Sequence, residues 1–185
     1  DISGTAHDFS GSTWAEGEIC LPCHAPHNAI EPDAGALWNH SVTVASYQVY
    51  GGDGSFLPTA EALDQKSILC MSCHDGTVAV DAFGGSAGTF TIFGSENLGT
   101  DLRDDHPVGI SGEYPTHSGF NDPSTWENVA GFGMRLYEMD IDGTPTPVVS
   151  CFSCHEPHNR NNTSDPEFMW IDNAGSALCL TCHNK

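Results

Sequence analysis

The stretch Cys20-Leu-Pro-Cys23-His24-Ala-Pro-His27-Asn28 contains the pattern that decides how this chain folds. Its first part, C-x-x-C-H, recurs as Cys70-Met-Ser-Cys73-His74, Cys151-Phe-Ser-Cys154-His155 and Cys179-Leu-Thr-Cys182-His183. In such a motif two thiols can form thioethers with one porphyrin, and the next residue, a histidine, then lies under the iron. C-x-x-C-H is therefore typical of c-type haem attachment.

The four motifs use all eight cysteines of the chain, and we predict that they hold four covalently bound haem c groups. The attachment residues are Cys20, Cys23, Cys70, Cys73, Cys151, Cys154, Cys179 and Cys182. The proximal iron ligands are His24, His74, His155 and His183. Eight cysteines of an exported protein can also form four disulfides, and two C-x-x-C pairs can bind zinc. Neither alternative explains why a histidine follows the second cysteine all four times.

Two kinds of motif alternate along the chain. The first and third continue as C-H-x-P-H-N, whereas the second and fourth are preceded by leucine and lack the second histidine. We therefore expect one tetrahaem domain over residues 1–185, made of two pseudo-repeated dihaem units at about 1–100 and 101–185. Each unit has a leading histidine, one motif of each kind and, between them, a tryptophan (Trp38 or Trp170).

Six further histidines compete for the sixth coordination position of four irons. They are His7, His27, His40, His106, His117 and His158. His27 and His158 occur three residues after a proximal histidine, so each must project toward a haem other than its own. The repeat favours His7 and His106, and each has a neighbouring aspartate that can orient the ring.

We therefore interpret His40 and His117 as surplus. Methionine ligation is not expected, because a histidine is available for every iron. Two histidines on each iron imply low potentials and no open coordination site.

The composition limits the possible partners. The net charge is −20, from 5 basic and 25 acidic residues, which argues against nucleic acid and against anionic lipid. It favours solubility and, more weakly, basic redox partners. No apolar run is long enough to span a membrane. The chain begins at Asp1 without a signal peptide, so we expect the mature form of an exported precursor, because haem c is attached outside the cytoplasm.

The expected fold is a mostly irregular, haem-cored multihaem cytochrome with short helices at the motifs and a few short strands or hairpins. Apolar residues make up only 38% of the chain, so the haems must supply much of the core. We expect a helix at 60–69 capped by Thr59, a shorter one after Ser176, and a hairpin of 135–141 with 147–150. Residues 42–50 are strand-like, and 89–93 form a short strand at most. The aromatic side chains expected on porphyrin faces are Trp14, Trp38, Trp126, Trp170, Phe56, Phe132 and Phe152.

Several of these motifs together resemble those of a known family. C-x-x-C-H-x-P-H-N, the upstream His-Asp-Phe at residues 7–9, L-C-x-S-C-H-D-G and Asp-His-Pro-Val-Gly at 105–109 are similar to proteins with doubled C-x-x-C-H motifs. Within that group the chain resembles the OmcE-type outer-surface cytochromes of metal-respiring microbes. The resemblance implies a subunit of an extracellular filament in which one haem takes a histidine from the adjacent subunit. It also implies that His27 has that role here.

The leading functional hypothesis is therefore extracellular electron transfer by a cytochrome filament, with the chain itself, other redox proteins or extracellular acceptors as partners. A second hypothesis is a monomeric periplasmic electron shuttle with the same haems. A third, from another class, is a multihaem reductase, which needs an iron with an open or lysine-filled site. The surplus of histidines argues against the reductase, so we expect an electron carrier and not an enzyme.

Overall fold

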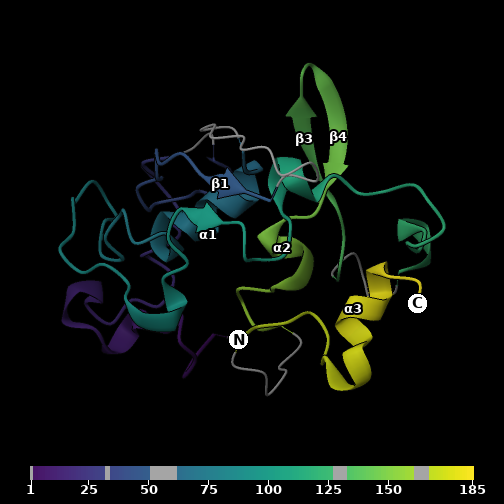
Figure 1. Cartoon of the computed structure of the whole chain (residues 1–185). Coiled ribbons are helices and arrows are strands. Elements are labelled where there is room, and N and C mark those ends of the chain that lie inside the picture. The colour runs from purple at the N-terminus through teal and green to yellow at the C-terminus, as the bar shows by residue number, and fades with distance from the viewer. Residues whose placement is uncertain (1, 32–33, 51–61, 127–132, 161–166) are drawn as a thin grey trace.

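The computed structural model describes residues 2–31, 34–50, 62–126, 133–160 and 167–185. Figure 1 shows that most of this part of the chain runs in loops around a few short elements. The α-helices are α1 (Gln65–His74), α2 (Cys151–Cys154) and α3 (Ala177–Cys182). The strands are β1 (Gln48–Val49), β2 (Asp101–Leu102), β3 (Tyr137–Ile141) and β4 (Thr144–Val148). Short 3-10 turns occur at Phe9–Gly11, Thr13–Ala15, Gly94–Glu96, Gly109–Gly112, Pro123–Thr125 and Ala174–Ser176.

Each α-helix presents one C-x-x-C-H motif. The expected helix at 60–69 is α1, but it begins later and continues through the second motif to His74. It begins at Gln65 because the Asp64 carboxylate accepts the backbone N–H groups of Lys66 and Ser67, which satisfies donors of the first turn. The predicted cap, Thr59, lies outside the described residues. The helix therefore positions the whole motif and does not merely lead into it.

The hairpin is confirmed, and the other strand predictions need correction. β3 pairs antiparallel with β4, and Asp142 and Gly143 both have positive φ, as a two-residue hairpin turn requires. Of residues 42–50, only Gln48–Val49 form a strand, which pairs in parallel with β2. Residues 89–93 form no strand, because the N–H groups of Thr89 and Phe90 donate to the Asp81 carboxylate instead of to a neighbouring strand.

The helix after Ser176 is present as α3, but the serine hydroxyl does not cap it. Ser176 has a φ of +65°, which is left-handed backbone, and its side chain makes no capping bond. Among the described residues, no helix is long and apolar enough to cross a bilayer.

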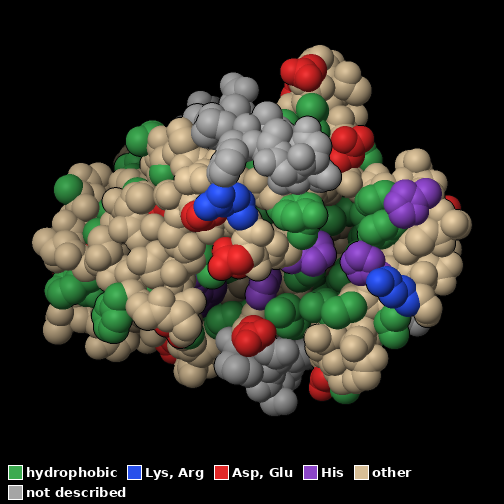
Figure 2. Space-filling view, in the orientation of Figure 1, with side chains coloured by type: hydrophobic (Ala, Val, Ile, Leu, Met, Phe, Trp, Pro, Cys, Tyr) green, Lys and Arg blue, Asp and Glu red, His purple; other side chains and the backbone are tan. Residues whose placement is uncertain are grey.

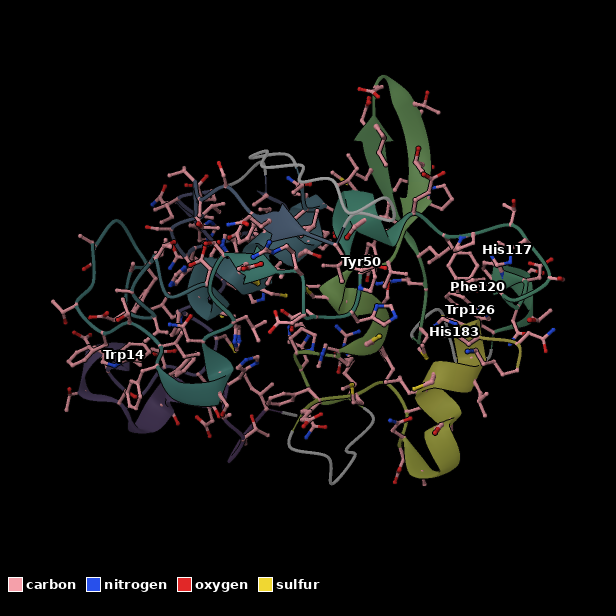
Figure 3. All side chains as sticks on the ribbon, viewed as in Figure 1. Trp14, Tyr50, His117, Phe120, Trp126 and His183 are labelled. Atoms are coloured by element: carbon pink, nitrogen blue, oxygen red, sulfur yellow. The ribbon has the colours of Figure 1, made fainter. Side chains whose placement is uncertain are left out.

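Two small apolar clusters pack the described part of the chain. One joins β1, β2 and α1 through Tyr47, Val49, Ala62, Leu63, Met71 and Leu102. The other lies beside α3 and consists of Tyr114, Trp126, Met134 and Trp170. Trp126 and Trp170 therefore pack against protein side chains, while Phe56 and Phe132 lie outside the described residues. Figure 3 shows Trp126, Phe120, His117 and His183 together at one end and Trp14 at the other.

The two sequence units are joined by direct contacts. β1 pairs with β2, α1 contacts α2, and the His7 ring reaches the Pro157 carbonyl. These contacts bring the second motif and the leading histidine of the first unit onto the third motif, which belongs to the second unit.

Candidate haem sites

Three of the four motif histidines are held in the same way. The Nδ1 atom of His24 lies 2.7 Å from the carbonyl oxygen of Ala36. That of His74 lies 2.8 Å from the Glu96 carbonyl, and that of His155 lies 2.6 Å from the Glu167 carbonyl. A carbonyl only accepts, so Nδ1 carries the proton and Nε2 keeps its lone pair. Metal-bound histidines are oriented by this kind of bond, so the three rings are prepared to bind iron through Nε2.

The loops that supply these carbonyls repeat after the first and third motifs. Both acceptors lie 12 residues beyond their histidine, and both loops return to form an antiparallel bridge, His24 with Trp38 and His155 with Met169. Asn28 and Asn159 both have positive φ, which asparagine tolerates better than most residues. The final asparagine of C-H-x-P-H-N is therefore explained by the turn that it makes.

The structural repeat corrects one correspondence. The sequence repeat matches Trp38 with Trp170 as the tryptophan of each unit. The bridges instead match Trp38 with Met169. Trp170 matches Asn39, since the N–H groups of these two residues donate to Cys154 and Cys23 in the same way. The indole of Trp170 is turned into the protein, where its N–H donates to the Phe152 carbonyl at 2.8 Å.

Three proximal histidines each face one histidine that the sequence proposed as a distal ligand. The ring centres of His24 and His158 are 6.0 Å apart, and those of His74 and His7 are 6.2 Å apart. His183 and His106 are 6.4 Å apart. The planes of the three pairs are inclined by 20°, 57° and 73°. Figure 2 shows histidine side chains gathered along a recess of one face, bordered by hydrophobic side chains.

These separations match the space that an iron needs. A metal ion bound by two imidazoles lies about 2 Å from each nitrogen, and each nitrogen lies about 1 Å from its ring centre, so the centres lie about 6 Å apart. The angle between the planes is free, because each ring can rotate about its bond to the metal. The three pairs can therefore each hold one iron between them.

The facing histidines also have Nδ1 engaged. Nδ1 of His7 lies 3.4 Å from the Pro157 carbonyl, and that of His106 lies 3.0 Å from the Pro107 carbonyl. Nδ1 of His158 lies 3.2 Å from the Glu156 carboxylate. The neighbouring aspartates that we expected to orient His7 and His106 do not do so; Asp8, for example, caps the turn at Phe9–Gly11. Burial lowers the pKa of His7, which favours the neutral form of its ring.

The two surplus histidines are held differently. His40 is buried, with Nδ1 2.8 Å from the Ser41 carbonyl and Nε2 2.9 Å from the Ala79 carbonyl, so both nitrogens are engaged. His117 uses Nδ1 as an acceptor for the N–H of Gly119 at 3.2 Å. Neither faces a motif histidine at the separation seen in the three pairs.

One proximal histidine and one candidate distal histidine remain. All ten histidines are within the described residues, and none of the other nine faces His155 at about 6 Å. His155 and His27 are both exposed. The part of the chain that the structure describes thus completes three histidine pairs and leaves the members of a fourth pair apart.

The thiols of successive motifs lie close together. Burial and the nearby Cys23 thiol raise the pKa of Cys73 to about 12. A hydrogen bond between the Cys70 and Cys151 thiols raises the pKa of Cys70 and lowers that of Cys151. Burial and the Cys182 thiol raise the pKa of Cys154 to about 11. None of the eight cysteines is in a disulfide, so all are available for thioethers.

A comparison with family models recognises two of the attachment motifs. The model described as the doubled CXXCH motif matches residues 145–185, which include the third and fourth motifs. The chain carries the paired attachment motif of multihaem c-type cytochromes. Covalently bound haem c and electron transfer follow from that motif. The comparisons with curated proteins and with solved structures found no match.

A further feature of the chain fits haem. The Trp38 ring contacts His24 edge-on, with ring centres 5.8 Å apart. Its Nε1 atom is buried and has no hydrogen-bond partner among the described residues. A buried N–H without an acceptor is costly, and haem propionates are acceptors. The residues present therefore fit haem in three respects: the cysteine thiols are free, the Nε2 atoms of three motif histidines keep a lone pair, and the Trp38 N–H lacks an acceptor that a propionate could supply.

Sequence reasoning missed one residue of the candidate haem sites. Glu156 is only 2% exposed, and it accepts from Nδ1 of His158 and from the backbone N–H groups of His158 and Arg160. The equivalent residue after His24 is Ala25, so the variable position of C-H-x-P-H holds a carboxylate in one unit only. That difference between the repeats was the available signal.

Proposed function

We propose that this chain conducts electrons over long distances through four closely spaced haem c groups, each with two histidine ligands, as a subunit of an extracellular cytochrome filament. The observation that carries the proposal is the arrangement of the histidines. Three pairs stand about 6 Å apart within the chain, and the two remaining members, His155 and His27, are exposed.

When bound, the haem irons supply reversible one-electron chemistry. The histidine pairs His24–His158, His74–His7 and His183–His106 would close both axial positions, leaving no site for a substrate to coordinate. The hydrogen bonds at Nδ1 hold most of these rings in one orientation. Such closed and rigid sites support an electron carrier over the reductase alternative.

The contacts between thiols support a continuous path. Cys23 lies near Cys73, Cys70 contacts Cys151, and Cys154 lies near Cys182. Each pair links successive motifs, so the attachment sites follow one another in space in the order of the sequence. Electrons would enter this series of haems at the first or the fourth motif and leave it at the other end.

The repeat supports polymerisation. His158 follows the third motif and faces His24 of the first motif. His27 occupies the equivalent place after the first motif, and the equivalent of His24 is His155. His27 of one copy would therefore pair with His155 of the next copy. Each copy carries a net charge of −20, so salt should favour assembly by screening the repulsion.

Electron microscopy of the native preparation tests the proposal, together with electron paramagnetic resonance of the oxidised protein. The wild type should form filaments in which every iron is low-spin. His27→Ala should give monomers with one high-spin iron per chain, while His117→Ala should behave as wild type. Filaments and all-low-spin iron in His27→Ala would overturn the assignment of His27. Wild-type monomers with four low-spin irons would favour the periplasmic shuttle.

A further inference from the structure

The helices that present the second and third motifs meet at one buried carboxylate. Asp64 is 3% exposed and caps α1, accepting the N–H groups of Lys66 at 3.0 Å and Ser67 at 3.2 Å. The Ser67 hydroxyl donates to the other oxygen of the same carboxylate at 2.5 Å. These bonds satisfy backbone N–H donors in the first turn of α1, and the carboxylate also faces the start of α2.

The same carboxylate is also bonded to the start of α2. Ser150, the N-cap residue of α2, donates its hydroxyl to Asp64 at 2.9 Å. The N–H of Cys151 donates to the Ser67 hydroxyl oxygen at 3.1 Å. Ser67 and Ser150 are almost fully buried, at 0% and 1% exposure. One side chain thus serves the first turns of two helices that are far apart in sequence.

The two helices are in contact, and each carries an attachment cysteine. Cys70 lies within α1, and Cys151 is the first residue of α2. Directional bonds to a buried carboxylate fix a register, whereas apolar packing alone permits the helices to slide. The geometry points to Asp64 as a positioning residue that sets the spacing and orientation of the second and third haem-attachment sites.

This inference rests on the proposed function only in that both motifs carry haem. Its consequence is that the second and third haems are coupled more rigidly than any other pair, because no comparable buried carboxylate joins another pair of motif helices in the described part of the chain. Asp64 would act on that pair without touching either iron.

The test uses the full-length holoprotein and compares Asp64→Asn, Ser67→Ala and Ser150→Ala with Asp81→Asn. Asp81 is a matched control, because it is also a buried aspartate that accepts two backbone N–H groups and a hydroxyl, but it bonds to no motif helix. Mass spectrometry gives the number of haems. Circular dichroism of the Soret band then reports the relative orientation of neighbouring haems, since close haems give a paired positive and negative signal.

All four variants should retain the wild-type haem number. The paired Soret signal should lose amplitude or change shape in Asp64→Asn and, to a smaller degree, in each serine variant. It should be unchanged in Asp81→Asn, even where that variant is less stable. If Asp64→Asn does not yield holoprotein, the two serine variants decide the question, because each removes one link to α2 and keeps the carboxylate.

Wild-type signals in all three variants of the Asp64 cluster would overturn the inference, and so would an equal change in Asp81→Asn. Failure of the proposed function is a separate result. It would appear in the wild type itself, as fewer than four haems or as the absence of any paired Soret signal.

Discussion

The rings of His24 and His158 face each other with centres 6.0 Å apart and planes inclined by 20°. The first histidine belongs to the first motif, and the second follows the third motif. The relationship therefore joins the two sequence units at one candidate iron site, and it can be tested by removing either ring.

Replacing His158 by alanine should open the iron of the first motif. We expect roughly a quarter of the ferric haem to become high-spin, because one of four sites loses a ligand. Electron paramagnetic resonance measures that fraction. His158→Met should instead keep the iron low-spin and raise one reduction potential. A fully low-spin His158→Ala protein would contradict the pairing.

His7 and His40 should respond differently to the same change. His7→Ala should produce one high-spin haem, since His7 faces His74. His40→Ala should leave every iron low-spin but lower the free energy of unfolding by about 1–3 kcal/mol, because it removes a buried hydrogen bond from the imidazole to a backbone carbonyl. Spectra and denaturant titrations of the two variants separate the roles. High-spin iron in His40→Ala alone would reverse the assignment.

Glu156 should tune one potential. Its carboxylate lies 3.2 Å from Nδ1 of His158 and makes that ring a stronger donor to iron. Glu156→Gln removes the negative charge at nearly constant size, so the reduction potential of the first haem should rise while the haem stays low-spin. Spectroelectrochemical titration measures the change. Glu167→Gln is the control, because only the backbone carbonyl of Glu167 is bonded to His155. Equal potentials in both variants and the wild type would refute the role of Glu156.

The Tyr47 hydroxyl should stabilise the buried end of α1. It donates to the Asp75 carboxylate at 2.6 Å, and Thr43 donates to the same oxygen at 2.7 Å. Tyr47→Phe leaves a 4% exposed carboxylate with one donor fewer, so the free energy of unfolding should fall by about 1–3 kcal/mol. Tyr137→Phe, in the hairpin, should lower the free energy of unfolding by less than Tyr47→Phe does. Equal stability losses in the two variants would contradict the argument.

The stability that Asp81 contributes should depend on pH. Burial alone would raise the pKa of Asp81. The hydrogen bonds from the N–H groups of Phe90 and Thr89 outweigh this effect, so the pKa lies below its ordinary value. The contribution is therefore complete above the ordinary aspartate pKa, about 4, and is lost as the pH falls through the lower folded value. The stability difference between wild type and Asp81→Asn should shrink on acidification. A stability difference between wild type and Asp81→Asn that grew below about pH 4 would contradict the lowered pKa of Asp81.

The motifs predicted the chemistry better than they predicted the helices and strands. C-x-x-C-H fixes the attachment residues locally, because two thiols and a histidine in sequence are all that one haem requires. The turn at Asp142-Gly143 was also predictable, because a two-residue turn depends on the backbone preferences of those two residues alone. The start of α1 was not predictable in this way, because it depends on Asp64, whose carboxylate is held by a hydrogen bond from the distant Ser150. Residues 89–93, where a short strand at most was expected, form none, because the Asp81 carboxylate accepts the N–H groups of Thr89 and Phe90.

The sequence by itself determined which residues can hold haem and which histidines compete for the remaining positions. Only the tertiary structure decided which histidine faces which. The repeat favours His7 over His40 as a ligand, but only the fold shows the physical difference between them. The His7 ring lies opposite His74, whereas both ring nitrogens of His40 lie close to backbone carbonyls. Attachment is a local property of five residues. Pairing depends on the distance between rings as much as 134 residues apart, as in His24 and His158, and only folding sets that distance.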